Sequence, residues 1–440
     1  MRVLILSEHA SLKFGGEAAL PLHYFRVLRQ RKIDVWMIVH ERTKSELSKI
    51  FADDLDRIFF IKDSFLHKLL FFLGKPLPSR ISYFTFGFLL RILTQVSQKK
   101  LAKSLIKKHQ IDITHQPIPV SPKEPSMIYD MGVPVIIGPM NGGMNYPEGF
   151  KKRESSWINL FVGLGRNFSN FTNTIIPGKL KADLLLVANE RTKNALPQCL
   201  ENKQIIELVE NGVDLSIWQQ EIETNFHATK KDLQEIKIIY LGRLVSWKGV
   251  DLLLVAFKNL ITILSEYKIT LEIIGDGKEI SSLEKQAQSL GLRIDNNDNS
   301  VSSKIVFQGQ LSQKDCAQHL KSADMMVLPS LYECGGAVVL EAMAMKIPVI
   351  ATNWGGPADY LDETCGILVS PDSQISFIDN ITQAMKKLIL DPDLRKSMGE
   401  MGYNKVISQF DWEKKVDRIL EIYHNVRQKD ESKLYYEQTN

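Results

Sequence analysis

Two glutamates with a pair of glycines between them form the strongest chemical pattern in the chain. Glu333 and Glu341 are separated by seven residues that include Gly335, Gly336 and Ala337. Glycines let backbone approach a ligand closely, and the amides at a helix start bind phosphate oxygens. Ionised carboxylates accept hydrogen bonds from sugar and ribose hydroxyls. The pattern therefore predicts a site for a phosphorylated ligand rich in hydroxyls; the alternative is a surface acid, a glycine turn and a helix acid without a ligand.

A second pattern places two cations after another apolar run. Arg243 and Lys248 follow the run 236–240 and precede an expected helix over 250–264. Two cations in one loop can neutralise a diphosphate, and the arginine can bind it through two hydrogen bonds at once. The alternative interpretation is a solvated basic loop.

Two loops in the first half of the chain carry weaker patterns. Gly15 and Gly16 follow the run 3–6 and precede an expected helix over 18–30, so they offer another phosphate cradle. His115 lies at an expected strand end followed by prolines, where its ring could be held rigidly at the site. The alternatives are a plain turn and a structural histidine. Neither half contains the G-x-G-x-x-G fingerprint, which leaves a dehydrogenase poorly supported.

The elements that must position these loops are buried parallel strands alternating with helices. Short runs that are apolar on both faces are typical of parallel strands covered by helices. We therefore predict an α/β fold with two doubly wound, Rossmann-like sheets, in which ligands bind after the strand ends and in a cleft between the domains. The expected strands are 3–6, 35–39, 133–137, 184–187, 236–240, 270–274, 305–307, 325–328 and 348–351.

The domain boundary is expected where turn chemistry meets a polar stretch. Asn211 and Gly212 form a turn signal, and the polar stretch 219–234 precedes the next apolar run. This predicts an N-terminal domain over 1–208 and a C-terminal domain over 209–410. A helix over 411–427 returns to the first domain, and 428–440 is a flexible polar tail.

Composition excludes several classes of protein. The chain has 440 residues, of which 44% are apolar and 24% charged, so it is not a disordered or low-complexity chain. No run reaches the ~18 apolar residues that span a bilayer. The apolar run at the N-terminus is too short for a signal peptide, and the four cysteines lack disulfide or metal spacing. We expect a cytoplasmic protein, either free or peripheral on the inner face of a membrane.

Charge is divided unequally between the two halves. Residues 1–200 hold 29 Lys and Arg against 16 Asp and Glu. Within 62–110 there are ten basic residues, one acid and many aromatic side chains, which favours an anionic membrane or a lipid-linked acceptor. The alternative is an ordinary helix pair with a solvated lysine face. A second apolar and basic stretch over 151–166, around Trp157, could border the same acceptor site, whereas no nucleic-acid motif is present.

The assembled patterns resemble glycosyltransferase family 4, which contains retaining enzymes of GT-B fold. The specific part is the second half, with "YLGRLVSWKGVDLLLVAF", "LEIIGDGKE", "ADMMVLPSLYECGGAVVLEAMAMKIPVIATNWGG" and "GILVSP". The resemblance of the first half is looser and rests on the loop at Gly15, on His115-Gln116-Pro117 and on the turn from Asn211 to Asp214. It covers roughly residues 2–424.

The resemblance implies a role for each residue. Arg243 and Lys248 would bind the donor diphosphate, with Gly15 and Gly16 closing over it. Glu341 would bind the nucleotide ribose and Glu333 the donor sugar, beside backbone at Gly335, Gly336 and Ala337. His115 would lie near the reacting sugar as a catalytic residue together with Glu333. Similar enzymes have His-Glu-Pro where this chain has Gln116.

The resemblance also implies the reaction. It would transfer a sugar from a nucleotide diphosphate, UDP by default and GDP as the other option, to a glycolipid, lipid-linked saccharide or polysaccharide acceptor, with retention at the anomeric carbon. No acidic metal-binding triplet stands out, so no metal or other cofactor is expected. The alternatives are a nucleotide-sugar epimerase of the same fold and a catalytically idle subunit that binds nucleotide sugars.

Overall fold

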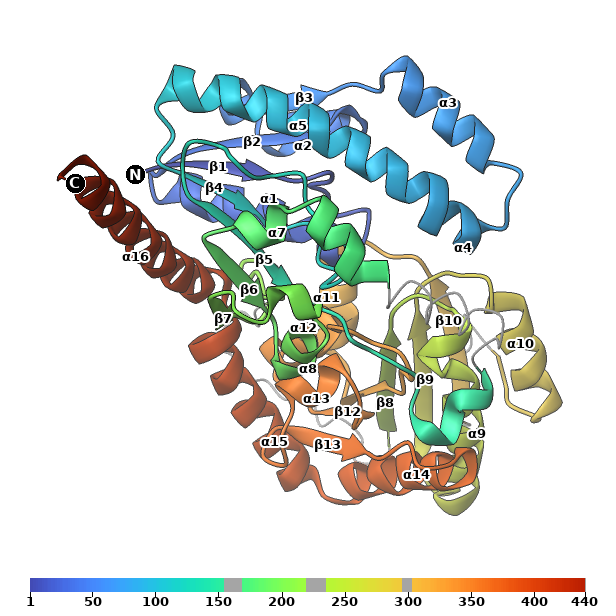
Figure 1. The fold of residues 1–440 in the computed structure, drawn as a ribbon. Helices are drawn as coiled ribbons and strands as arrows, with labels where there is room; N and C mark the ends of the chain where they lie inside the picture. Colours follow the sequence, from blue (N-terminus) through green and yellow to red (C-terminus); the bar gives the residue numbers. More distant parts are fainter. Residues whose placement is uncertain (154–167, 219–234, 295–302, 440) are drawn as a thin grey trace. The chain divides into compact units, whose positions relative to one another are not determined.

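The chain folds into two compact units. The computed structural model describes residues 1–153, 168–218, 235–294 and 303–439 (Figure 1). Of these, 1–143, 168–211 and 412–439 form unit 1, and 144–153, 212–218, 235–294 and 303–411 form unit 2. The chain thus passes from the first unit to the second after Asn211, at the turn signal of the sequence.

Unit 1 is built on a parallel seven-stranded sheet. Its strand order is β3-β2-β1-β4-β5-β6-β7, so β1 lies between β2 and β4 and the direction of winding reverses there. The strands are β1 (Arg2–Leu6), β2 (Asp34–His40), β3 (Ile58–Ile61), β4 (Ile113–Gln116), β5 (Val135–Met140), β6 (Leu184–Val187) and β7 (Ile205–Glu207). The helices are α1 (Gly16–Gln30), α2 (Lys44–Ile50), α3 (Phe65–Gly74), α4 (Ser79–Ser82), α5 (Phe88–His109), α7 (Gly178–Lys181), α8 (Glu190–Asn194) and α16 (Trp412–Thr439).

Alternate residues of the strands feed two cores, one on each face of this sheet. Val3 and Ile5 of β1 point into a core shared with α1 and α16. Leu4 and Leu6 point into a core shared with α5, which crosses over the sheet (Figure 1). The period of two along a strand sends successive side chains to opposite faces, so a strand that is apolar throughout requires helices on both sides.

The last helix completes the first core. Trp412, Val416, Ile419 and Tyr423 of α16 are buried in it, at spacings that place them on one helix face. The expected return of the C-terminal helix to the first domain is confirmed. The helix continues to Thr439, where the sequence predicts a loose tail from 428. Lysine, glutamate and glutamine favour a helix even without apolar neighbours. The polar composition after residue 428 therefore did not indicate where the helix ends.

A buried lysine of α16 fixes the segment that leads out of unit 1. The Nζ atom of Lys415 donates to the carbonyl oxygens of Val209, Glu210 and Asn211. Burial lowers the pKa of Lys415 to about 7. Three carbonyl acceptors in succession hold the chain immediately before it enters unit 2.

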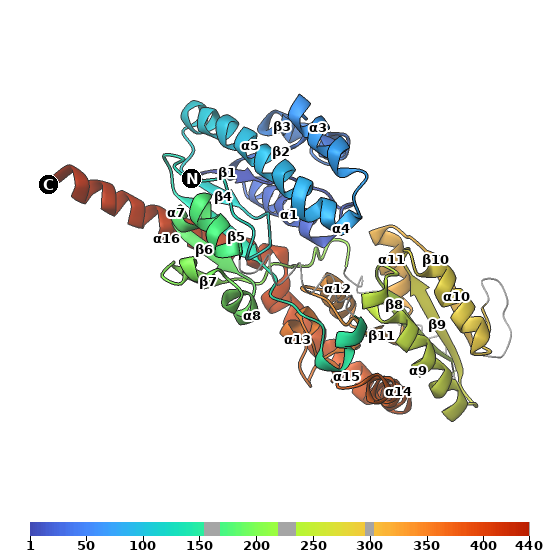
Figure 2. The same ribbon diagram turned by 45° about the vertical axis from the view of Figure 1, so that its right-hand side comes forward.

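Unit 2 repeats the architecture with six parallel strands. The order β10-β9-β8-β11-β12-β13 is that of a Rossmann sheet, with the winding reversed between β8 and β11 (Figure 2). The strands are β8 (Glu235–Leu241), β9 (Lys268–Ile274), β10 (Lys304–Gly309), β11 (Met325–Leu328), β12 (Val349–Thr352) and β13 (Gly366–Val369). The helices are α9 (Val250–Ile263), α10 (Ile280–Ser289), α11 (Gln313–Lys321), α12 (Ala337–Ala344), α13 (Gly356–Tyr360), α14 (Gln374–Leu390) and α15 (Pro392–Lys405).

A short segment from the first half of the sequence belongs to unit 2. The segment 144–153 ends in a 3-10 turn, Glu148–Arg153. Its Phe150 ring packs edge-on against Phe377 of α14, and the guanidinium of Arg153 pairs with the Asp251 carboxylate at 2.7 Å. The backbone at Gly149 is so close to Asp372 that an added Cβ would lie 2.1 Å from its carbonyl oxygen. The expected N-terminal domain over 1–208 included this segment, so its position in unit 2 was not predicted.

The predicted fold class is confirmed in its main features. Every expected strand overlaps an observed one, whereas β3, β4, β7 and β13 were not in the list of expected strands. Most of the apolar, basic stretch over 151–166, including Trp157, and the polar stretch 219–234 lie outside the described residues. Among the described helices, none is both long enough and apolar enough to cross a membrane.

Candidate functional site

The site in unit 2 lies where the winding of its sheet reverses. Lys248 follows β8 and Glu333 follows β11, and these two strands are neighbours. The Nζ atom of Lys248 forms an ion pair with an Oε atom of Glu333. Their side chains are 11% and 15% exposed, so the pair is largely withdrawn from water. The structure thus brings together the cation of one predicted motif and the first acid of the other.

A glycine in the left-handed region holds these two loops in contact. Gly249 has φ of 68°, ends the 3-10 turn Ser246–Lys248 and begins α9. A Cβ at this position would lie 2.2 Å from the carbonyl oxygen of Pro329, in the turn after β11. The amide of Leu331 also donates to the Trp247 carbonyl at 2.8 Å. Only glycine permits both this backbone angle and this approach, which explains how Lys248 reaches Glu333.

Close backbone contacts in two further pairs of glycines hold neighbouring loops next to these two. The amide of Gly356 donates to the Glu333 carbonyl at 2.8 Å, and an added Cβ there would lie 1.9 Å from the Gly335 carbonyl oxygen. On the other side, a Cβ at Gly275 would lie 1.9 Å from the carbonyl oxygen of Gly242. The loops after β8, β9, β11 and β12 therefore interlock at one edge of the sheet through backbone contacts.

Arg243 extends from the same loop into solvent. Its side chain is exposed, while its carbonyl oxygen accepts a hydrogen bond from the Tyr240 hydroxyl at 3.0 Å. Burial raises the pKa of Tyr240, and the charge of Glu333 raises it further, so the phenol remains a donor. Tyr240 therefore fixes the backbone of Arg243 and leaves the guanidinium free to turn toward a ligand.

Helix α12 offers amides beside this ion pair. It begins at Ala337, after Gly336 with φ of 86°, and the expected start of the helix is confirmed. No side chain of the described residues caps its first turn. The N–H groups at a helix start attract anions because they have no partner within the helix. Gly335, Gly336 and Ala337 thus border the Lys248–Glu333 pair with backbone that can meet phosphate or hydroxyl oxygens.

Glu341 lies one turn further along α12 and has an altered acidity. It is partly buried, and the removal of its carboxyl group from water raises its pKa to about 7. Its charge also contributes to the raised pKa of the Cys316 thiol on α11, so the two groups are near each other. A carboxyl group whose pKa lies near 7 suits a site where the hydroxyls of a ligand replace the water around that group.

The glycine loop of unit 1 is open. Gly15 and Gly16 are exposed between β1 and α1, and Gly15 has φ of 100°. A Cβ on either glycine would meet no heavy atom within 4 Å. The loop follows the first strand at the reversal of winding in this sheet, which is where ligands bind in open α/β folds.

His115 lies inside β4 and is completely buried. Its Nε2 donates to the Gly138 carbonyl at 2.6 Å, so its Nδ1 accepts from the Tyr423 hydroxyl at 2.7 Å. Tyr24 packs edge-on against the ring. Burial lowers the pKa of His115 to about 4, so it is neutral at physiological pH. His115 thus lies next to the end of the strand, as expected, but both of its ring nitrogens are bonded within unit 1.

Gln116, the residue that departs from the family pattern, is also buried. Its Oε1 accepts a hydrogen bond from the Ser126 hydroxyl at 2.6 Å. A neutral amide suits this position, since a buried carboxylate with a single hydroxyl partner would be poorly compensated. Gln116 thus ties β4 to the loop before β5.

Sequence reasoning missed the contribution of 144–153. The indole of Trp354, after β12, donates to the Asn145 carbonyl at 2.8 Å. Tyr146 packs against Tyr332, the residue before Glu333, with ring centroids 5.6 Å apart. The aromatic residues in the loop next to Glu333 were the signal that the sequence offered. Their contact partner could not be found from it, because the segment 144–153 is distant in sequence.

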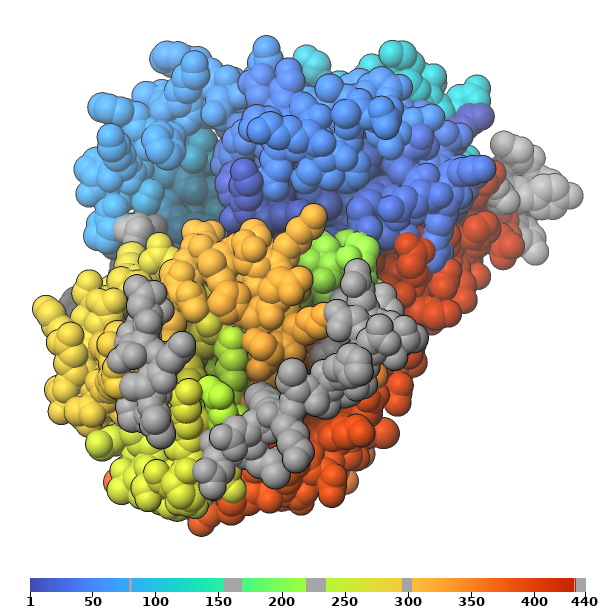
Figure 3. All heavy atoms as spheres, turned by 180° about the vertical axis from the view of Figure 1, so that it is seen from behind, coloured from blue at the N-terminus to red at the C-terminus, as the bar shows by residue number. Residues whose placement is uncertain are grey.

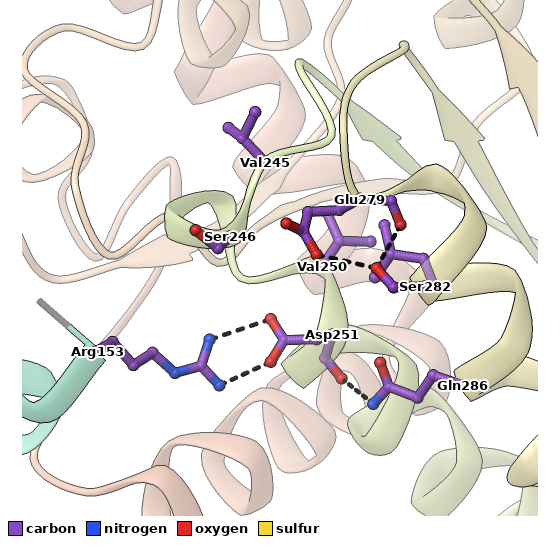
Figure 4. A pocket seen from close by; sticks show the side chains of 9 residues that line it. Arg153, Val245, Ser246, Val250, Asp251, Glu279, Ser282 and Gln286 are labelled. Carbon is purple, nitrogen blue, oxygen red and sulfur yellow. Dashed lines mark hydrogen bonds and ion pairs between the residues drawn. The ribbon is translucent and has the colours of Figure 1, made fainter. Parts of the chain in front are cut away.

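A pocket with both polar and apolar walls lies beside the β8–α9 loop of unit 2. It has a volume of about 240 Å³ and is lined by Arg153, Val245, Ser246, Val250, Asp251, Glu279, Ser282, Leu283 and Gln286. Figure 4 shows that Arg153 points at Asp251, while Gln286 donates to the backbone of Asp251. These groups satisfy one another, so the pocket serves mainly to attach 144–153 to α9.

Comparison with known proteins identifies the second half of the chain. The family model of Glycosyl transferases group 1 matches residues 221–405. The match to that family lies in the second half of the chain. A curated relative, an uncharacterised glycosyltransferase of Methanocaldococcus jannaschii, is 28% identical over 60% of this chain and 63% of its own length. A GDP-mannose-dependent monoacylated alpha-(1-6)-phosphatidylinositol monomannoside mannosyltransferase of Corynebacterium glutamicum is 26% identical over 55% of this chain and 62% of its own length. Each match therefore spans less than two thirds of the relative.

Solved structures extend the likeness to nearly the whole chain. The crystal structure of Anabaena HepE in complex with UDP covers 97% of this chain and 100% of its own, with a TM-score of 0.62 and 17% identity. The structure of WaaG, a glycosyltransferase involved in lipopolysaccharide biosynthesis, covers 96% and 99% with a TM-score of 0.57 and 16% identity. The chain thus has the GT-B fold, with two Rossmann-like domains.

Proposed function

We propose that this group 1 protein is a glycosyltransferase that uses a nucleotide diphosphate sugar. The observation that carries the proposal is the Lys248–Glu333 pair at the reversal of winding in unit 2, next to the start of α12. The cation and the amides at that position match the diphosphate of such a donor, and the carboxylate matches its hydroxyls. The group 1 family and the glycosyltransferase relatives support the same activity.

Each residue takes a role from its chemistry. Lys248 and the mobile end of Arg243 neutralise the diphosphate, and the amides from Gly335 to Ala337 add hydrogen bonds. Glu333 accepts from sugar hydroxyls, and Glu341 accepts from the ribose once it is ionised. When the donor diphosphate draws Lys248 toward itself, the carboxylate of Glu333 is released for the sugar. Within unit 1, the open loop at Gly15 and Gly16 offers backbone amides to a phosphate group.

The reaction breaks one bond and forms another at the anomeric carbon. The bond to the donor phosphate oxygen breaks through a state with oxocarbenium character, and the acceptor hydroxyl oxygen bonds to the same carbon. The leaving diphosphate gains negative charge, which the cations and helix amides stabilise. In the retaining course that we propose, the acceptor attacks on the face of the leaving group, and its proton passes to the departing phosphate oxygen. His115 does not touch the sugar in this scheme; it positions the end of β4.

We infer a UDP-hexose as donor and a glycolipid or lipid-linked saccharide as acceptor. The UDP complex of a protein with this fold supports the nucleotide, while a mannosyltransferase relative named for GDP-mannose makes GDP the competing choice. The relative named for a phosphatidylinositol mannoside supports a lipid-linked acceptor. The positive charge of residues 1–200 agrees with an anionic acceptor.

The decisive experiment compares donor binding and product formation. Calorimetry with UDP, GDP and their hexose conjugates should show binding of one nucleotide series. Lys248→Ala should weaken it about tenfold or more, since a charged hydrogen bond contributes about 1.5–3 kcal/mol. Lys387→Ala, an exposed lysine on α14, is the matched control and should bind as the wild type does.

Product analysis separates transfer from the epimerase reaction. Incubation with the bound donor and membrane extracts should release nucleoside diphosphate in step with glycosylated lipid. An isomerised donor with no nucleoside diphosphate would identify an epimerase, and unchanged binding by Lys248→Ala would contradict the site.

A further inference from the structure

Unit 1 carries a helical hairpin whose apolar side chains face water. The hairpin comprises residues 64–89 and contains α3, α4, the π-turn Tyr83–Gly87 and the start of α5. Eleven of the 23 exposed large hydrophobic side chains of the described residues lie in it. They are Phe65, Leu66, Leu69, Phe71, Phe72, Leu73, Leu77, Ile81, Tyr83, Phe84 and Leu89. Soluble monomers rarely expose apolar side chains in such a cluster unless a partner covers them.

Helix α3 is attached to the unit through polar groups. Its only buried residues are His67 and Gly74, whereas Phe65, Phe71 and Phe72 are 78%, 68% and 71% exposed. His67 accepts from the Ser64 amide at 3.1 Å through Nδ1 and contacts the Thr94 hydroxyl on α5 at 3.2 Å through Nε2. An ordinary surface helix packs its apolar face inward. This helix has the opposite orientation, and a capped, buried histidine secures it.

The turn that follows is anchored in a similar way. The Arg91 guanidinium lies 4.4 Å from the centre of the Tyr83 ring and pairs with Glu124 at 2.5 Å. A Cβ at Gly74 would lie 2.7 Å from the Ser82 hydroxyl, so the end of α3 is held close to α4. These contacts therefore fix the base of the hairpin while its phenylalanines remain exposed. Figure 3 shows the segment in light blue at the upper left.

Charge on the hairpin favours an anionic surface. Lys68 and Lys75 are exposed and belong to no ion pair within the described part of the chain. Asp63, the one acid in the sequence stretch 62–110, pairs with His40 at 3.0 Å. Exposed aromatic and leucine side chains flanked by free lysines are the composition of helices that lie in the interface of an anionic bilayer.

The remainder of the basic segment is different. In the second half of α5, Ala102, Leu105 and Ile106 are buried in the core, and Lys103 and Lys107 face solvent. This half of α5 is therefore an ordinary amphipathic helix with a solvated lysine face, which was the alternative interpretation of residues 62–110. Within 62–110, the large exposed apolar side chains of the described residues therefore lie in the hairpin, apart from Val96 of α5.

We propose that the hairpin 64–89 inserts its phenylalanines and leucines into the interface of an anionic lipid bilayer, with Lys68 and Lys75 at the headgroups. Interfacial helices bury their apolar face about 5–10 Å deep in the bilayer. The exposed side chains of a single layer of helices can fill this depth. The hairpin thus docks unit 1 on the surface where a lipid-linked acceptor would be found. The proposal goes beyond the transferase activity and does not depend on it, because docking needs no sugar nucleotide.

Vesicle sedimentation of the full-length protein tests the proposal. Wild type should bind phosphatidylcholine vesicles containing phosphatidylglycerol, and binding should weaken as NaCl rises. Combined Phe65→Ser, Phe71→Ser and Phe72→Ser should weaken binding at least about tenfold, given the apolar area removed. Combined Lys68→Gln and Lys75→Gln should remove most of the dependence on phosphatidylglycerol.

Matched controls keep the result specific. Ile375→Ser removes a side chain that is 84% exposed on α14, and Lys103→Gln with Lys107→Gln removes two exposed lysines of α5. Both should bind like wild type, and all variants should keep the wild-type melting temperature because every altered side chain is exposed. Failure of wild type to bind, equal losses in the controls, or indifference to anionic lipid and salt would overturn the proposal. So would a stable dimer in vesicle-free solution that the phenylalanine changes dissolve, since a second copy would then cover the hairpin.

Discussion

Glu341→Gln should stabilise the protein at high pH while weakening donor binding. Burial raises the pKa of Glu341 from 4.5 to about 7. The folded state thus retains a proton that the unfolded state releases, and the stability of wild type declines as pH rises from 4.5 through 7. The difference in pKa corresponds to at most about 3 kcal/mol. Because the side chain is only partly buried, about 1–3 kcal/mol is the expected cost above pH 7.

The assay is thermal unfolding of wild type and Glu341→Gln between pH 5 and pH 8. The stability difference in favour of the variant should grow by about 2 kcal/mol over this range, or ~4–8 °C in melting temperature for a domain of this size. Asp379→Asn, an exposed acid on α14, is the control and should show no such trend. Wild-type donor affinity should rise through pH 7 as Glu341 ionises, and the variant should lose that rise. A stability difference that is flat with pH would refute the raised pKa and the reasoning built on it.

Three further predictions concern the framework and the absence of a metal requirement. His115→Ala should lower the free energy of unfolding by about 2–4 kcal/mol, since it leaves the Tyr423 hydroxyl and the Gly138 carbonyl unpaired inside unit 1. The lowered pKa of His115 makes wild type less stable as pH falls below 6.5, and chemical unfolding should show this slope diminished in the variant. Gly249→Ala should reduce both melting temperature and donor binding because its Cβ meets the Pro329 carbonyl, whereas Gly16→Ala has open space and should melt like wild type. Transfer should continue in EDTA if Arg243 and Lys248 neutralise the diphosphate unaided; loss of activity that Mg²⁺ restores would contradict that role.

The sequence predicted the fold, and it suggested the residues of the candidate site, because both inferences depend on local patterns. Apolar runs set the strands, and glycines beside charged residues marked the loops after β8 and β11. Contact between Lys248 and Glu333 followed from topology, since the ends of adjacent parallel strands meet at one edge. The approach of Gly249 to Pro329 could not be read from either loop alone, because it depends on the register of two segments 80 residues apart.

Long-range packing accounts for the features that were not foreseen. His115 is buried because Tyr423, more than 300 residues later, donates to its ring. The segment 144–153 joins unit 2 through Phe377 and Asp251, which no local pattern reveals. The inverted orientation of α3 has the same origin: its sequence is apolar enough for a core, and only the pairing of His67 with Thr94 shows which face points inward.

The return of α16 to unit 1 has a consequence during synthesis. The first core needs Trp412, Val416 and Tyr423, but the ribosome makes them about 200 residues after the rest of that unit. At ~5–20 residues per second, unit 1 would wait roughly 10–40 s with one sheet face covered by α1 but not yet by α16, while unit 2 is made. The carbonyls of Val209, Glu210 and Asn211 would meanwhile lack the ammonium of Lys415. The nascent chain should therefore be most open to chaperones and proteases during this interval, and the arrival of its final helix should end that vulnerability.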